Sequence, residues 1–260
     1  MVLQALIFDV DGTLAETERD GHRVAFNQTF AEFGLDWDWS IDLYGELLAV
    51  SGGKERIRFY LDRYRSNFQP PTDLDRFVAT LHAAKTRHYR ELLDRGEIPL
   101  RWGVRRLIEE ARNEGMRLAI ATTSALPNAM ALLDRTLDPT WFEVIAAGDI
   151  VPAKKPAPDI YHYVLDRLGL TAGECLVFED THYGLQAATQ AGLNAVVTLN
   201  DYTLGQDFSP AALVLDHLGE PDRPFNVKAG NARGATYFDL TLAWHLHSEL
   251  AGLGGFEPPT

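Results

Sequence analysis

The sequence predicts an α/β fold, a doubly wound parallel sheet into which an all-helical domain is inserted. Three observations carry this prediction. The chain opens with a short apolar run, residues 3–8, that is typical of a fully buried strand. Residues 17–93 show helical spacing and no convincing strand, and from about Arg95 short apolar runs alternate with helical stretches. The first strand must join the later ones, because alone it could not bury itself.

The composition is that of a soluble globular protein, and its charge restricts the partners. Of the 260 residues, 46% are hydrophobic and 23% are charged, and the net charge is −13. This acidic balance argues against binding of nucleic acid and of anionic membranes. An anionic substrate would need a local cluster of cations, because the overall field repels it.

The cysteine content and the start of the chain indicate the cellular compartment in which the protein is expected. The single cysteine, Cys175, cannot form an internal disulfide, and neither a signal peptide nor a membrane-spanning run is visible. We therefore expect a cytoplasmic protein. We also expect a monomer, because no long exposed apolar seam is apparent.

The helical insert follows the first strand. Apolar residues such as Phe26, Phe30 and Phe33 recur at spacings of three and four, which indicates a helix. Further on, Pro70 and Pro71 interrupt the pattern, and Thr72 or Asp73 can cap the helix that follows. We expect helices over residues 18–33, 41–48, 54–64 and 73–93.

The second part of the chain alternates strands and helices. Apolar runs that we interpret as strands lie at residues 116–121, 144–147, 176–178, 195–199 and 212–215. Helical stretches lie between them at 104–113, 127–135, 159–168 and 184–191. We therefore expect an α/β core from residues 1–16 and 94–225, a helical cap from 17–93, and a C-terminal part from 226–260. In this last part, residues 226–235 are polar and Gly-rich like a linker, a short helix is expected near 239–250, and the end is expected to fray.

Two acids stand where the first strand ends. Side chains alternate along a strand, so Asp9 and Asp11 leave its end on the same side, and Gly12 lets the chain turn sharply. Such a pair is tolerated mainly when a cation lies between the acids or when one stays protonated. Taken alone, the motif is equally typical of an ordinary solvated turn.

Polar residues also follow the later strands, at the edge where doubly wound sheets bind their ligands. Each group has a simpler explanation on its own: a helix cap, a solvated charge or an acidic helix start. However, all of these groups follow successive strands and carry complementary charges. Taken together, they therefore favour a functional site. The groups are Thr122, Thr123 and Ser124, then Lys154 and Lys155, then Glu179 and Asp180.

These groups suit metal-assisted chemistry on a phosphoryl group. Asp9, Asp180 and a backbone carbonyl near Asp11 offer hard oxygens, which suit Mg²⁺. Lysine and hydroxyl donors opposite would bind the remaining phosphoryl oxygens. Two unit charges 4 Å apart repel by roughly 4 kcal/mol at an effective dielectric constant near 20, so a carboxylate needs such cations to approach a phosphate.

The same four pieces resemble the signature of the haloacid dehalogenase superfamily. They are residues 9–13 (Asp-Val-Asp-Gly-Thr), Thr122, Lys155 with Pro156, and Glu179 with Asp180. The helical insert resembles the cap of the subgroup that contains β-phosphoglucomutase and many sugar-phosphate phosphatases. Residues 16–23 and 51–57 resemble the CbbY branch, and the resemblance covers about residues 1–220.

The resemblance implies a role for each motif residue. Asp9 is expected to be the nucleophile that forms an aspartyl-phosphate, and Asp11 the acid and base for the leaving oxygen and the attacking water. Thr122 and Lys155 would hold the transferring phosphoryl group. The ligands of Mg²⁺ would be Asp9, the main-chain carbonyl of Asp11 and Asp180, with Glu179 in direct contact with the ion or one layer behind it. An acid at Asp11 argues against dehalogenation, since a halide needs no protonation.

The cap is expected to choose the substrate. Lys54 and Arg56 lie at a probable helix start in an acidic protein, and a distal phosphate on the substrate would explain them, although a solvated basic helix face is the alternative. Glu16, His22 and Tyr44 are candidates for reading sugar hydroxyls, and His22 is equally compatible with an ordinary helix position. We add Thr123 and Ser124 to the substrate-binding candidates.

The resulting expectation is an Mg²⁺-dependent sugar-phosphate phosphatase. Resemblance to the CbbY branch implies a ketopentose bisphosphate as its small-molecule substrate, with xylulose 1,5-bisphosphate as the best single choice. In that branch the activity removes an inhibitory by-product of Rubisco, which belongs to the Calvin cycle. Two alternatives remain open: a β-phosphoglucomutase-like mutase that uses the same residues, and a non-catalytic phosphosugar-binding module.

Overall fold

The computed structural model describes residues 2–50, 52–148, 150–250 and 252. The chain divides into two compact units, one made of Met1–Glu16 with Pro99–Thr260 and the other of Thr17–Ile98. Within the described residues, none of the helices has the length and apolar character needed to cross a bilayer.

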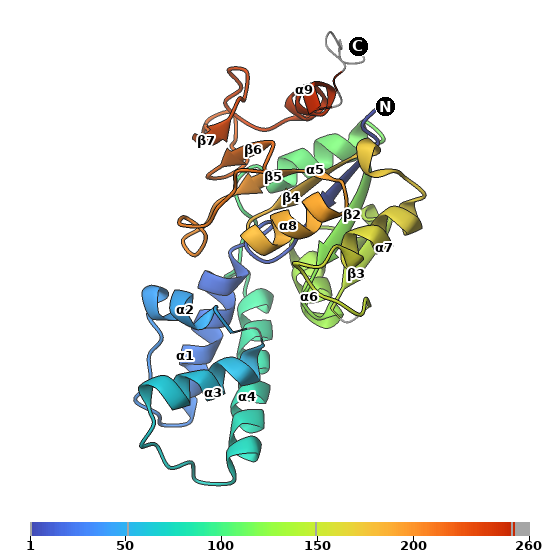
Figure 1. The fold of residues 1–260 in the computed structure, drawn as a ribbon. Helices are drawn as coiled ribbons and strands as arrows, with labels where there is room; N and C mark the ends of the chain where they lie inside the picture. Colours follow the sequence, from blue (N-terminus) through green and yellow to red (C-terminus); the bar gives the residue numbers. More distant parts are fainter. Residues whose placement is uncertain (1, 51, 149, 251, 253–260) are drawn as a thin grey trace. The chain divides into compact units, whose positions relative to one another are not determined.

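The first unit is built on a seven-stranded sheet with the order β3-β2-β1-β4-β5-β6-β7 (Figure 1). Strands β1 to β6 are parallel, and β7 pairs antiparallel with β6, so the predicted doubly wound α/β fold is confirmed. All four side chains of the central strand β1 are buried. The strands are β1 (Ala5–Phe8), β2 (Arg117–Thr122), β3 (Val144–Ala147), β4 (Cys175–Glu179), β5 (Asn194–Thr198), β6 (Leu213–Leu215) and β7 (Val227–Gly230).

Helices cover both faces of this sheet. One face packs against α7 and α8 (Figure 1). There Ile160, Val164 and Leu185 lie in one apolar cluster with Ile7 and Val177 of the strands. Burial of this kind is the main favourable term in folding. The helices of the unit are α5 (Val104–Asn113), α6 (Leu126–Thr136), α7 (Asp159–Leu168), α8 (His182–Gln190) and α9 (Leu240–Leu250), with single 3₁₀ turns η2 (Pro139–Trp141) and η3 (Ala172–Glu174).

The other face carries a short aromatic column. Phe8 of β1 and Phe178 of β4 are register partners, and their rings stack at 4.7 Å between centroids. Phe238, which precedes α9, meets Phe178 edge-on at 5.2 Å, and all three rings are fully buried. Phe238 of the C-terminal part of the chain therefore packs behind β1, which Asp9 follows, and β4, which ends in Glu179.

The C-terminal part differs from the sequence expectation at one place. We expected residues 226–235 to be a linker, but residues 227–230 form β7, the edge strand beside β6. All four of its residues are exposed, so it lacks the apolar alternation by which strands are recognised. The helix expected near 239–250 is present as α9. Of the tail that we expected to fray, residues 253–260 lie outside the described part of the chain.

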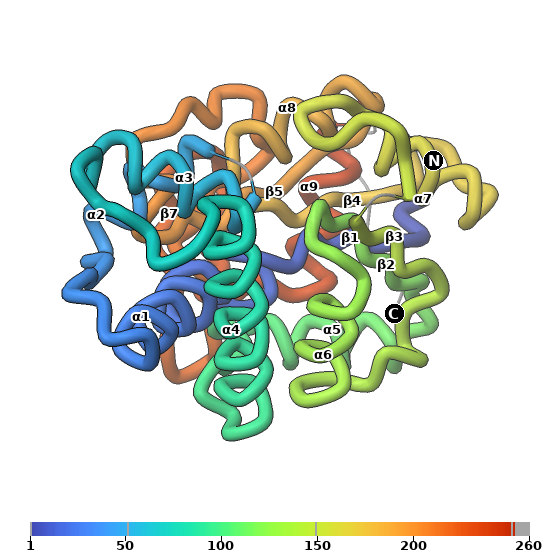
Figure 2. The backbone as a smooth tube through the Cα atoms, turned by 90° about the horizontal axis from the view of Figure 1, so that it is seen from below, coloured from blue at the N-terminus to red at the C-terminus, as the bar shows by residue number. Residues whose placement is uncertain are grey.

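The second unit contains helices and connecting segments, and no strand among its described residues. Figure 2 shows α1 and α4 running side by side, and aromatic rings such as Phe26, Trp37 and Trp39 fill its interior. Asp73 caps α4, as one of the two expected residues, by accepting a hydrogen bond from the backbone N–H of Arg76 at 3.0 Å. The elements are a π-helical turn η1 (Thr17–His22), α1 (Arg23–Glu32), α2 (Ile41–Leu47), α3 (Gly53–Tyr64) and α4 (Leu74–Asp94).

Candidate active site

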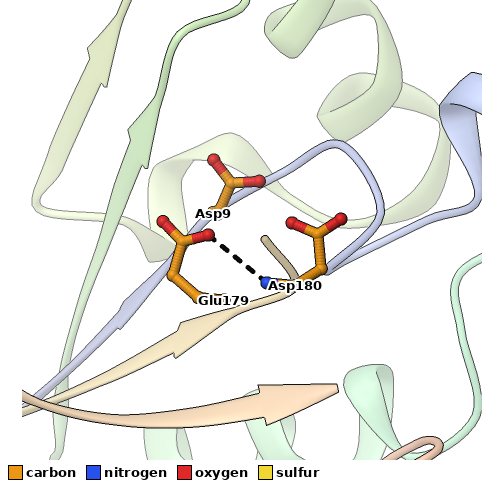
Figure 3. A group of neighbouring side chains, drawn as sticks. All are labelled: Asp9, Glu179 and Asp180. Atoms are coloured by element: carbon orange, nitrogen blue, oxygen red, sulfur yellow. Dashed lines mark hydrogen bonds between the residues drawn. The ribbon is translucent and has the colours of Figure 1, made fainter. Parts of the chain in front are cut away.

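Three carboxylates meet at the carboxyl ends of the two central strands. Asp9 follows β1, Glu179 ends β4, and Asp180 comes next. Because β1 and β4 are parallel neighbours in register, these side chains reach one space, with an oxygen from each within 4.8 Å of the others (Figure 3). All three residues are buried. The sequence placed these acids at strand ends, and the sheet brings them together.

Lys155 supplies the positive charge of the site. Its ammonium donates hydrogen bonds to Asp9 Oδ1 at 2.7 Å, to Glu179 Oε1 at 2.6 Å and to the backbone carbonyl of Ala121 at 2.8 Å. The three acceptors lie in β2, in β4 and directly after β1, although Lys155 itself lies in the segment between β3 and α7. Charge-assisted bonds of this length are the stronger class of hydrogen bond.

Burial controls the protonation of this cluster. It raises the pKa of Asp9 to about 8, against the opposing attraction of Lys155. Burial, followed by the charges of Asp9 and Glu179, also holds the pKa of Asp180 well above its ordinary value. For Lys155, burial disfavours the ammonium, but Asp9 and Glu179 outweigh it and raise the pKa. Ionisation of all three acids would therefore place more negative charge in the cluster than one lysine can balance.

This cluster fits a divalent cation. When all three acids are ionised, the carboxylates and the one ammonium leave an excess of two negative charges, which a divalent ion would neutralise. Hard carboxylate oxygens in a small, acidic, buried space are the donors that Mg²⁺ prefers. The residues present therefore fit the metal that the sequence resemblance implied.

Asp11 lies at the edge of the same site. Its Oδ2 accepts a hydrogen bond from the hydroxyl of Ser124, which follows β2. The buried Thr122 orients this neighbour, because its Oγ1 accepts the backbone N–H of Ser124 at 3.1 Å. Thr123, between them, is exposed. The structure thus brings together Asp11, Thr122 and Ser124 with the carboxylates and Lys155.

Sequence reasoning missed Tyr161 of α7. Its side chain is fully buried, its hydroxyl bonds to Glu179 Oε1 at 2.5 Å, and the Lys155 ammonium lies 5.3 Å from its ring centroid. Glu179 Oε1 thus accepts from both Lys155 and Tyr161. In the sequence Tyr161 occupies an apolar position of a helix, and no signal there distinguishes it from a core aromatic residue.

Gly184 was missed as well. It lies in the first turn of α8, and a Cβ built on it would meet Glu179 Oε2 at 1.9 Å. The missing side chain therefore makes room for the carboxylate. No signal for this was available, because Gly184 is the first residue of the helix expected over residues 184–191, a position that glycine commonly occupies.

Glu16, predicted to read sugar hydroxyls, is held by an arginine of its own unit. Its carboxylate forms an ion pair with Arg101 Nε at 3.0 Å. Arg101 also donates to backbone carbonyls of Gly12, Thr198 and Asp216, among others. This arginine joins the turn after Asp9 to the ends of β5 and β6.

Most of the predicted substrate-binding residues of the helical unit are buried in the interior of that unit. Tyr44 is fully buried and donates to Glu18 at 2.5 Å, while Arg56 donates to Tyr44 at 2.8 Å and to two backbone carbonyls. His22 is buried and lies 2.9 Å from the ammonium of Lys85. Burial, and then the charge of Lys85, lower the pKa of His22 to about 3, so the imidazole is neutral.

Lys54 differs from Arg56 in its surroundings. The two were expected to form one cationic cluster, but Arg56 points into the unit and Lys54 is exposed at the start of α3. Arg58, one turn on, is paired with Asp75 at 2.7 Å. Ser51, which the sequence resemblance included, lies outside the described residues.

Comparison with known proteins supports the interpretation of this site as the active site of an enzyme. The sequence model of the haloacid dehalogenase-like hydrolases matches residues 3–192, and the chain belongs to this family. It is therefore an enzyme, a hydrolase whose site holds the four motifs described above.

Within this family the chain is similar to CbbY proteins. It is 46% identical over 248 residues to Protein CbbY (plasmid) of Cupriavidus necator, covering 94% of this chain and 97% of the relative. It is 50% identical over 214 residues to Protein CbbY of Rhodobacter capsulatus, covering 81% and 92%. Among solved structures, it is similar to a mutant of CbbY from Rhodobacter sphaeroides in complex with xylulose-(1,5)bisphosphate, with a TM-score of 0.72, 44% identity, and coverage of 83% of this chain and 95% of that one.

Proposed function

We propose that the protein is an Mg²⁺-dependent sugar-phosphate phosphatase that acts through an aspartyl-phosphate on Asp9, with xylulose 1,5-bisphosphate or a similar ketopentose bisphosphate as its substrate. The single observation that carries the proposal is the contact between Lys155 and Asp9, inside a cluster of buried acids at the carboxyl ends of β1 and β4. Similarity to CbbY, of which one structure holds xylulose bisphosphate, supports the choice of substrate.

In this proposal Asp9 begins the reaction. Its carboxylate oxygen attacks phosphorus, an O–P bond to Asp9 forms, and the bond between phosphorus and the sugar oxygen breaks. Lys155 holds the carboxylate in place and, with Thr122, binds the phosphoryl oxygens as negative charge moves onto the leaving group. The hydrogen bond of 2.7 Å from Lys155 to Asp9 Oδ1 leaves Oδ2 to attack.

Asp11 acts first as the general acid and then as the general base. Protonated at the start, it gives its proton to the leaving sugar oxygen, so that a neutral alcohol departs. The resulting carboxylate then takes a proton from water as the water oxygen attacks phosphorus, which releases inorganic phosphate and regenerates Asp9. Ser124 supports this role, because its hydroxyl donates to Asp11 and fixes the carboxyl group.

Mg²⁺ would be held by Asp9, Asp180 and the main-chain carbonyl of Asp11, and when bound it would neutralise charge that otherwise repels the phosphate. Glu179 contributes in another way: its Oε1 accepts from both Lys155 and Tyr161, which supports a role in holding the lysine.

A phosphate-release screen tests the proposal. Purified protein is incubated with a panel of sugar mono- and bisphosphates, with Mg²⁺ or with EDTA, and free phosphate is measured. We expect stoichiometric release from xylulose 1,5-bisphosphate that needs Mg²⁺. Conversion of a hexose 1-phosphate to its 6-phosphate without release would instead identify a mutase.

The variant Asp9→Asn supplies the control. It is nearly isosteric, keeps an oxygen for Lys155 and lacks the nucleophile, so turnover should fall by at least about 10⁴-fold while the circular dichroism spectrum stays unchanged. Substantial residual turnover would remove Asp9 from the role of nucleophile.

A further inference from the structure

Asn200 touches the candidate metal site from the end of β5. The residue is buried, and its side-chain Nδ2 donates a hydrogen bond to Asp180 Oδ2 at 2.7 Å. Asp180 is itself almost fully buried, and its other oxygen has the hydroxyl of Thr13 at 3.5 Å. The 2.7 Å contact is therefore the shorter of the two side-chain hydrogen bonds described for this carboxylate.

The local turn dictates which end of the Asn200 amide faces Asp180. Its Oδ1 accepts the backbone N–H of Tyr202 at 3.0 Å, and its own backbone N–H donates to the hydroxyl of Thr203 at 3.0 Å. The backbone N–H of Thr203 in turn donates to the carbonyl of Asn200 at 3.1 Å. With its oxygen used in this way, the amide must present its NH₂ group to the carboxylate.

Gly12 opens the space in which the contact forms. Its φ of +82° is a backbone conformation that side chains disfavour. A Cβ there would lie 2.1 Å from Asp180 Oδ2 and 2.7 Å from Asn200 Nδ2. The turn after the nucleophile, the carboxylate of Asp180 and the amide of Asn200 therefore pack as one arrangement, in which each constrains the others.

We propose that Asn200 is a positioning residue, which fixes the side-chain conformation of Asp180 and thereby sets the affinity of the site for Mg²⁺. The inference rests on the proposed function, because it takes Asp180 as a ligand of the metal. A ligand that is already held in place does not have to lose conformational freedom when the ion binds. Partners that orient metal ligands in this way typically change metal affinity by about 10–100-fold.

The test is a titration with Mn²⁺ as the probe, since its free form is measured directly by electron paramagnetic resonance. Two variants are compared with the wild type. Asn200→Ala removes the amide. Asn200→Ser keeps a hydroxyl that can accept the N–H of Tyr202 and preserve the turn, but it is too short to reach Asp180. We expect both to raise the Kd for Mn²⁺ by about tenfold or more.

Asn226→Ala is the matched control. Asn226 also donates to an aspartate, Asp216, at 2.5 Å, but it is exposed and lies immediately before β7. Its variant should bind Mn²⁺ as the wild type does. Thermal unfolding and circular dichroism of each variant confirm that the fold is kept, and Asn200→Ser decides the matter if Asn200→Ala does not fold.

A second readout separates positioning from a direct part in the reaction. The Mg²⁺ concentration that gives half-maximal rate should rise with the Kd for Mn²⁺, while kcat at saturating Mg²⁺ should stay within a few-fold of the wild type. A Kd within twofold of the wild type in both variants would overturn the inference about Asn200. A wild-type protein that does not bind Mn²⁺ would instead overturn the metal part of the proposed function.

Discussion

Lys155 Nζ lies 2.7 Å from Asp9 Oδ1, so a buried cation contacts the proposed nucleophile directly. The same nitrogen lies 2.6 Å from Glu179 Oε1. One lysine thus spans two neighbouring strands, and its side chain is nearly inaccessible to solvent. Separating such partners is costly, because it would leave the buried ammonium of Lys155 uncompensated.

The first prediction concerns the pH dependence of stability without metal. The pKa of Asp9 is raised from 3.8 to about 8, so between these values the folded protein holds a proton that the unfolded chain has released. Stability must then fall as pH rises through this range. We expect the melting temperature in EDTA to decrease between pH 6.5 and pH 8, and to decrease less in Asp9→Asn.

The pH range begins at 6.5 because, below that value, His22 has the opposite effect on the stability of the fold. Its pKa is lowered from 6.5 to about 3, so it contributes stability that is lost as pH falls below 6.5. Added Mg²⁺ should flatten the slope, because the ion favours ionised carboxylates. A slope that is equal in wild type and Asp9→Asn would contradict the assignment to Asp9.

The second prediction concerns the buried hydroxyl of Tyr161. Tyr161→Phe removes the 2.5 Å hydrogen bond to Glu179 and leaves the ring in place. A hydrogen bond to a charged group is worth about 1.5–3 kcal/mol, so we expect kcat to fall by roughly tenfold or more through misplacement of Lys155, with little change in KM. Steady-state kinetics measure both constants.

Tyr163→Phe is the control for Tyr161→Phe. Tyr163 lies on the same helix, is only partly buried, and contacts Arg167 instead of the site. It should leave kcat unchanged. Equal losses in the two variants would show that the effect belongs to α7 in general and not to the contact with Glu179.

The third prediction concerns Gly184. In Gly184→Ala the new methyl group would overlap the carboxylate of Glu179, which a Cβ would approach to 1.9 Å. Overpacking of this kind typically costs about 1–3 kcal/mol in the free energy of unfolding, and displacement of Glu179 should also lower kcat. Gly205→Ala is the comparison, because a Cβ at Gly205 meets no atom within 4 Å. A Gly184→Ala protein with normal stability and activity would mean that Glu179 is free to move aside.

The fourth prediction concerns recognition of a second phosphate. If Lys54 binds the distal phosphate of a bisphosphate, Lys54→Ala should raise KM for bisphosphates by roughly tenfold, and should change KM for monophosphates far less. Arg58→Ala is the control, since Arg58 lies on the same helix and is paired with Asp75. An equal effect of Lys54→Ala on both substrate classes would remove the role proposed for it.

The strands and the core site were predictable because their signals are local. Each strand that ends at the site is an apolar run followed by a polar group, and parallel pairing brings such groups to one edge. Asp9, Lys155 and Asp180 were found in this way. Asn200 was within reach of the same rule, since it follows directly on the apolar run at residues 195–199.

What the sequence did not reveal depends on packing between distant segments. The four exposed residues of β7 carry no periodic pattern, because backbone pairing with β6 alone defines that strand. The inward turn of Arg56 depends on Tyr44 and on the carbonyls of Leu47 and Val50, which no spacing within α3 indicates. Tyr161 is recognised as more than a core residue only when its hydroxyl is seen beside Glu179.

The aromatic column behind the site makes the end of the chain inseparable from its catalytic strands. A shortened version that stops before Phe238 would strip the Phe178 ring of its cover and let water reach the underside of the strand that bears Glu179. Because Phe178 stacks in turn on Phe8, the loosening would pass to the residue immediately before Asp9. Engineers who wish to trim or fuse this protein should therefore do so beyond α9.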